Sequence, residues 1–144
     1  MLVMIKYNSI EHALALSAQR KDERISIKDE PKFEKFPTYG SSYIWMKVLC
    51  LNNVGLKYLS NLPQNLVQLF AENNEITGDQ LKYLPASVLG LKLGNNKITE
   101  IDSLSFGLKW LLMSNNDLSL DSFMNIQNHS LKVLNVSENP RLTQ

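Results

Sequence analysis

The chain has 144 residues, a formal net charge of +1 and 20% charged residues. This length predicts one domain, and the near-neutral charge excludes nucleic-acid binding driven by bulk positive charge. No apolar run approaches the roughly 18 residues of a membrane-spanning helix, and the first residues lack the pattern of a secretory signal. The single cysteine, Cys50, excludes an internal disulfide and favours an intracellular environment.

Residues 1–45 are expected to form an N-terminal cap. Ser9 precedes an amphipathic segment, which predicts an N-capped helix at about 9–21. The following segment, 22–45, is expected to hold a degenerate repeat. Its Ile25 and Ile27 align with the two inward apolar residues of the repeat at 131–142, which is described below.

Residues 46–144 contain one pattern five times. The copies start at 46, 66, 88, 108 and 131 and read MKVLCLNNVGL, LVQLFAENNEI, VLGLKLGNNKI, LKWLLMSNNDL and LKVLNVSENPRL. Apolar residues at the fourth and sixth positions of each copy predict a short strand with one buried face. One copy cannot bury this face alone, so we expect neighbouring copies to stack into a single folded unit.

The segments between the predicted strands differ in length. Residues 57–65 and 99–107 are short and predict extended chain or 3₁₀ turns. Residues 78–85 and 119–128 are long enough for one or two helical turns.

The pattern resembles that of the leucine-rich repeat family, L-x-x-L-x-L-x-x-N-x-L with a period of about 20–29 residues. The resemblance covers residues 46–142. It implies an α/β fold, a curved right-handed solenoid with a concave parallel β-sheet and a helical N-terminal cap. An LP pair before two copies is similar to the repeats of bacterial effectors that pathogens deliver into host cells. The implied location is the cytoplasm or the inside of a host cell.

The ninth position of the pattern carries four asparagines, Asn74, Asn96, Asn116 and Asn139. The resemblance implies that these side chains turn inward and hydrogen-bond to the backbone of adjacent turns of the chain. A carboxamide suits this role because it both donates and accepts. In the first copy Val54 occupies the position, and Asn52 or Asn53 is the alternative that would substitute for the missing asparagine.

The third, fifth and seventh positions point out of the concave sheet in such a solenoid. We expect a partner-binding surface there, because contiguous exposed apolar residues mark partner surfaces and Trp is enriched in hot spots. Its centre is expected at Phe70, Lys92, Trp110 and Leu112, surrounded by Val48, Gln68, Glu72, Val133 and Asn135.

Two glycines in the middle copy, Gly90 and Gly94, predict a shallow floor in this surface. Lys92 would rise from that floor inside an apolar rim and suit an acidic group of a partner. The alternative is that Trp110 lies flat on Gly90 and shields the sheet.

The sequence carries no catalytic motif. His12 and His129 are far apart, no histidine is placed to activate Cys50, and no metal-ligand spacing or phosphate-binding loop occurs. We therefore expect no enzymatic activity, no metal and no cofactor.

The expected function is binding of a partner protein, as an adaptor or an inhibitor, with neither nucleic acid nor membrane as partner. The alternatives are a substrate-recognition fragment of a larger effector enzyme, such as a ubiquitin ligase, and a carbohydrate- or lipid-binding module. Self-association through the C-terminal end is a further expectation, because no capping segment follows the last copy.

Overall fold

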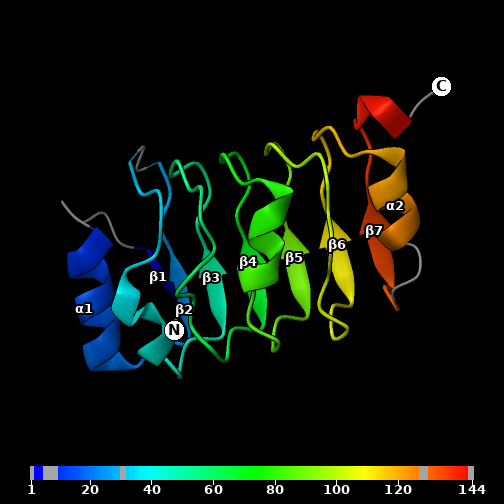
Figure 1. Ribbon diagram of the computed structural model, residues 1–144. Helices are drawn as coiled ribbons and strands as arrows, with labels where there is room; N and C mark the ends of the chain where they lie inside the picture. Colours follow the sequence, from blue (N-terminus) through cyan, green and yellow to red (C-terminus); the bar gives the residue numbers. More distant parts are fainter. Residues whose placement is uncertain (1, 5–9, 30–31, 127–129, 143–144) are drawn as a thin grey trace.

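The computed structural model describes residues 2–4, 10–29, 32–126 and 130–142. Seven strands form one open parallel sheet in chain order, so the expected α/β class with a parallel sheet is confirmed (Figure 1). With η for 3₁₀ helices, the elements are β1 (Leu2–Met4), α1 (Ile10–Arg20), β2 (Arg24–Ser26), η1 (Thr38–Ser42), β3 (Val48–Cys50), β4 (Gln68–Phe70), η2 (Gly78–Tyr83), β5 (Gly90–Lys92), β6 (Trp110–Leu112), α2 (Leu120–Ile126), β7 (Val133–Asn135) and η3 (Pro140–Leu142).

The strands share one register across the sheet. Each strand has three residues, and its central residue pairs with the central residue of the next strand. Side chains alternate between the two faces of a strand, so these central residues form one row on one face. From β2 to β6 the row is fully buried, and it consists of Ile25, Leu49, Leu69, Leu91 and Leu111.

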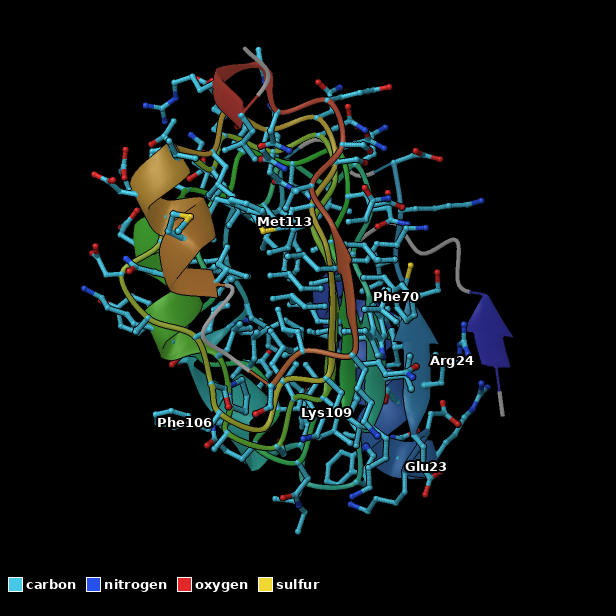
Figure 2. All side chains as sticks on the ribbon, turned by 90° about the vertical axis from the view of Figure 1, so that its right-hand side faces the viewer. Glu23, Arg24, Phe70, Phe106, Lys109 and Met113 are labelled. Atoms are coloured by element: carbon cyan, nitrogen blue, oxygen red, sulfur yellow. The ribbon has the colours of Figure 1, made fainter. Side chains whose placement is uncertain are left out.

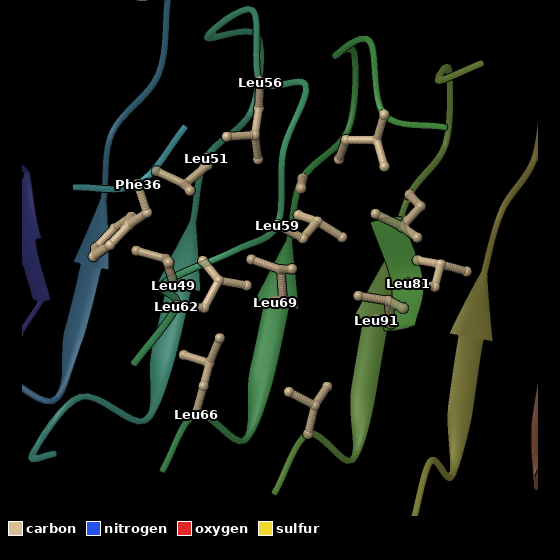
Figure 3. Packing of buried hydrophobic residues seen from close by; sticks show 14 of the residues in the cluster. Phe36, Leu49, Leu51, Leu56, Leu59, Leu62, Leu66, Leu69, Leu81 and Leu91 are labelled. Atoms are coloured by element: carbon tan, nitrogen blue, oxygen red, sulfur yellow. The ribbon is translucent and has the colours of Figure 1, made fainter. Parts of the chain in front are cut away.

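The helical segments lie on one face of the sheet and leave the other face uncovered (Figures 1 and 2). The core fills the space between the sheet and these segments (Figure 3). Leu59, Leu62 and Leu81 come from the segments between strands and are at most 3% exposed. Every helix in the described part of the chain is too short or too polar to cross a membrane.

The structure of the segments between strands agrees with the predictions made from their lengths. The predicted helical turns at 78–85 and 119–128 are present as η2 and α2, and no helix forms in 57–65 or 99–107. A strand also forms in the segment assigned to the degenerate repeat, where Ile25 and Ile27 are buried.

The N-terminal region contains a strand that was not expected beside the predicted helix. Helix α1 forms close to the predicted bounds, but it follows a strand, β1, that pairs in parallel with β2. The helix therefore connects two strands, and it lies at the end of the molecule next to β1 and β2 (Figure 1). Its inner face contains Ala13, Leu14 and Ser17, which are at most 2% exposed.

An aromatic cluster forms the core between β2 and β3. Phe36 is fully buried, with its ring centroid 6.0 Å from that of Phe33 and 6.4 Å from that of Tyr43. Burial, together with the nearby Tyr39, raises the pKa of Tyr43. Trp45 lies 5.2 Å from Tyr43, and the Lys21 ammonium group lies 4.0 Å from the Trp45 ring centroid. This cluster does not follow the repeat pattern and was not predicted.

Candidate binding surface

The uncovered side of the sheet, here called the open face, consists of the first and third residues of each strand. Phe70 and Arg24 point away from the helical side, whereas Met113 points into the core (Figure 2). The common register arranges the side chains in two rows across β2 to β7. The first row is Arg24, Val48, Gln68, Gly90, Trp110 and Val133, and the second is Ser26, Cys50, Phe70, Lys92, Leu112 and Asn135.

An aromatic pair occupies the middle of the open face. Phe70 on β4 and Trp110 on β6 have ring centroids 5.9 Å apart and planes inclined by 43°. Both side chains are half-buried although no helical segment covers them. Trp110 reaches across β5 toward Phe70 because Gly90, its neighbour in the first row, has no side chain.

Trp110 is held against the backbone of β5. A Cβ atom added to Gly90 would lie 1.8 Å from Trp110 Cε2 and 1.9 Å from Cζ2. The indole therefore lies on Gly90, as in the alternative arrangement, and the shallow floor expected in the middle repeat is wrong. Gly94 is also buried, next to Glu72 and Ser114.

The charge of Lys92 is compensated within the open face. Its Nζ lies 3.3 Å from Glu72 Oε1, and the two side chains are 39% and 25% exposed. Lys92 does lie between Phe70 and Leu112 as expected, but its charge is already paired within the chain. The ion pair forms because Glu72, two residues beyond β4, lies within reach of the neighbouring strand.

The remaining predicted residues surround this centre. Val48, Gln68 and Leu112 are half-buried, and Val133 is 53% exposed. Asn135 Oδ1 accepts a hydrogen bond from its own chain, from the Ser137 N–H. The surface thus combines an aromatic centre, a surround of aliphatic and amide side chains, and one internal ion pair.

Two residues of β2, Arg24 and Ser26, extend the open face and were missed. Arg24 pairs with Val48 and Ser26 pairs with Cys50. A signal was present, because the buried Ile25 and Ile27 imply that Arg24 and Ser26 face the other way.

The four asparagines of the ninth position bridge neighbouring turns of the chain. Each Oδ1 accepts a 3.0 Å hydrogen bond from a backbone N–H one turn earlier, and Asn74 accepts two, from Val54 and Leu56. Each Nδ2 donates to a carbonyl oxygen of the preceding strand region at 2.8–3.0 Å; these oxygens belong to Leu51, Ala71, Leu93 and Met113. This is the inward arrangement that the resemblance implies.

Val54 stands where the first copy lacks the ninth-position asparagine. Neither Asn52 nor Asn53 takes over the role of that asparagine. Asn52 Oδ1 accepts the Glu72 N–H, and Asn53 Nδ2 donates to Asp29 Oδ1. Val54 is fully buried in this position and contributes to the apolar core instead.

The histidines and the cysteine named in the sequence analysis do not come together in the described part of the chain. Residues 2–4, 10–29, 32–126 and 130–142 contain no group of three His, Cys, Asp or Glu side chains able to hold a metal ion. His12 is on the exposed side of α1, Cys50 is on the open face, and His129 lies outside the described residues.

Comparison with curated proteins finds a partial similarity. The chain is 34% identical over 95 residues to a protein named as a histone, from Tetrahymena thermophila. The match covers 63% of this chain and 22% of that protein, so the chain spans about a fifth of the length of the curated relative it matches. No family model matches the chain.

Proposed function

We propose that the chain is a leucine-rich repeat solenoid that binds a partner protein through its open, concave face. The aromatic pair of Phe70 and Trp110 carries this proposal. Large aromatic side chains at the middle of an uncovered sheet are typical of hot spots in protein interfaces. The solenoid is supported by the common register of the strands, by the asparagine bridges and by the recurring leucine pattern.

The rigidity of this centre favours recognition of a partner. Trp110 lies against the backbone at Gly90 and packs beside the Phe70 ring. A side chain already fixed in one position loses little conformational freedom on binding, which increases the affinity obtained from a given contact area. The Lys92–Glu72 pair beside it is neutral as a unit, so the centre suits an apolar side chain of the partner better than a charged one.

Two alternatives use the same surface and differ in the ligand. A recognition fragment of a larger enzyme would also bind a protein, with the chemistry located outside this chain. A carbohydrate or lipid site would use the Phe70–Trp110 platform to stack on a ring or an acyl chain. Direct binding of purified saccharides or lipid vesicles in the absence of any protein would favour this second alternative.

The experiment compares open-face variants with a matched control. Phe70→Ala and Trp110→Ala remove the centre, whereas Tyr83→Ala removes an aromatic side chain that is 49% exposed on the helical side. Proteins captured by the wild type would be identified, purified and titrated against each variant, with folding verified by circular dichroism. Truncation of a hot-spot residue costs at least about 2 kcal/mol, which is a decrease in affinity of about 30-fold.

We expect that decrease for both open-face variants and an unchanged affinity for Tyr83→Ala. Equal affinities for all four proteins would contradict the proposal and shift attention to the helical side.

A further inference from the structure

The open face alone is too small for a stable protein complex. Six three-residue strands, at about 4.8 Å between strands and about 3.3 Å per residue, cover about 300 Å². A standard interface buries about 800 Å² on each partner. A partner bound as proposed above must therefore also contact one of the two edges where the chain enters or leaves the strands.

The leading edge is the row of residues directly before the strands. These residues are connected by backbone hydrogen bonds of 2.7–2.8 Å from one turn to the next, and they are Glu23, Lys47, Val67, Leu89, Lys109 and Lys132. Leu89 is 42% exposed at the middle of the row, with Val67 half-buried beside it. Phe106, which is 90% exposed, lies at the same end of the molecule as Lys109 and Glu23 (Figure 2).

The three lysines of the leading edge differ from several others in their charge environment. Lys57, Lys92 and Lys97 form ion pairs with glutamates at 3.1–3.3 Å. Within the described ranges, Lys47, Lys109 and Lys132 form no ion pair. The leading edge thus combines apolar side chains with three lysines outside any ion pair and one acid, Glu23, which leaves it with an excess of positive charge.

The trailing edge, formed by the turns after the strands, has the opposite character. Its residues have left-handed backbone conformations, with φ of 55–62°, and are Asp29, Asn53, Asn73, Asn95, Asn115 and Glu138. Several of their side chains are already bonded to one another, Asn53 to Asp29 and Asn115 to Asn95. The charged members, Asp29 and Glu138, are acidic and would repel an acidic partner.

We infer that the partner extends from the open face over the leading edge, and that the segment it places there is acidic and interspersed with apolar residues. Its carboxylates lie against Lys47, Lys109 and Lys132, and its apolar side chains contact Leu89 and Val67. This inference rests on the proposed function, and it adds the edge used and the chemistry of the partner. Charge complementarity of this kind sets specificity and the rate of association.

The probe is a random library of 16-residue peptides displayed on phage and selected against the wild-type protein. One enriched peptide would be synthesised, labelled and titrated by fluorescence anisotropy. The edge variant carries Lys47→Glu, Lys109→Glu and Lys132→Glu. Its control reverses three exposed lysines elsewhere, Lys32→Glu, Lys35→Glu and Lys82→Glu. The open-face variant carries Phe70→Ala and Trp110→Ala, and circular dichroism checks that all three fold.

The expected peptides contain Asp or Glu alternating with apolar residues. Their affinity decreases at least tenfold for the edge variant, is unchanged for the control and decreases for the open-face variant. Binding to the wild type also weakens as salt is added, a readout that needs no variant to fold.

Other outcomes separate the two proposals. Neutral or basic peptides, or acidic ones that are insensitive to salt and to the edge variant, overturn the inference; if they still need Phe70 and Trp110, the open face stands. Peptides that need only the lysines support the acidic preference of the edge and overturn the open face as the centre. Failure to enrich any peptide that depends on either surface overturns both.

Discussion

Adjacent asparagines perform two different roles in this chain. Asn73, Asn95 and Asn115 have φ near 55–57°, a left-handed conformation that asparagine tolerates better than most residues. The next residue in each case places its side chain inward and bonds to the backbone of the preceding turn. One asparagine thus turns the backbone, and the following one satisfies the polar groups which that turn leaves in the interior.

The Asn74→Ala variant should be markedly less stable. It leaves the buried N–H groups of Val54 and Leu56 and the carbonyl of Leu51 without their partner. Each unsatisfied buried group costs about 1–3 kcal/mol, so we expect a loss of at least about 2 kcal/mol in the free energy of unfolding by urea titration. In Asn73→Gly, the matched control, the backbone keeps its positive φ and the stability changes by less than about 0.5 kcal/mol. Equal losses for the two variants would show that the inward side chain has no special role.

At the scale of single elements, η2 depends on a close approach between backbones. Gly78 begins η2, and a Cβ atom there would lie 1.5 Å from the carbonyl oxygen of Glu100 in the next turn. We expect Gly78→Ala to displace η2 and lower the free energy of unfolding by about 1–3 kcal/mol. At Gly107, the control position, the nearest atom to an added Cβ is 3.6 Å away. Gly107→Ala should leave the urea midpoint unchanged, and a tolerated Gly78→Ala would contradict the packing.

Helix α2 is connected to the preceding turn by Glu100. This carboxylate accepts hydrogen bonds from the hydroxyls of Ser119 and Ser122, and Arg141 lies 3.6 Å away. The bonds from the two serines and the positive charge of Arg141 lower the pKa of Glu100.

A lowered pKa in the folded state gives a defined pH dependence. The stabilisation by Glu100 is present above the pKa of an unfolded glutamate, about 4.3, and is lost as the pH falls through the lower folded value. We therefore expect Glu100→Gln to be less stable than the wild type at pH 7, with the difference disappearing in acid. Thermal melts from pH 7 to pH 3 measure this, with Asp102→Asn as an exposed control. A pH-independent difference would mean that the glutamate acts through packing instead of charge.

The repeating elements could be predicted from the sequence, because each strand and turn is encoded by a local pattern. The short strand β1 could not, since three apolar residues near the start of a chain carry no periodicity. The Lys92–Glu72 pair and the contact of Trp110 with Gly90 depend on side-chain conformations between neighbouring strands. The sequence places these residues in adjacent repeats, and only the three-dimensional arrangement shows that they contact one another.

At the scale of the whole molecule, strand order equals chain order, so each strand pairs only with its sequence neighbours. Stability in such an arrangement is approximately a sum over neighbouring units. The central leucines of β3 to β6 are fully buried, whereas Leu134 in β7 is half-buried.

We therefore expect amide hydrogen exchange to be slowest in β3 to β6 and faster in β7. Exchange measured by mass spectrometry on peptides covering each strand tests this gradient. Uniform protection from β2 to β7 would instead indicate that the sheet opens only as one cooperative unit.

Neighbouring strands keep the same register although the chain segments between them differ in length. This determines where the chain can accept insertions and deletions. Strand starts are 20 residues apart between β3 and β4 and between β5 and β6, where no helix intervenes. They are 22–24 residues apart where α1, η1, η2 or α2 intervenes. The additional residues are absorbed on the helical side, and the rows of the open face remain aligned. Insertions and deletions are thereby uncoupled from recognition: a connecting loop can be lengthened, or replaced by a grafted peptide, while the binding side chains keep their spacing.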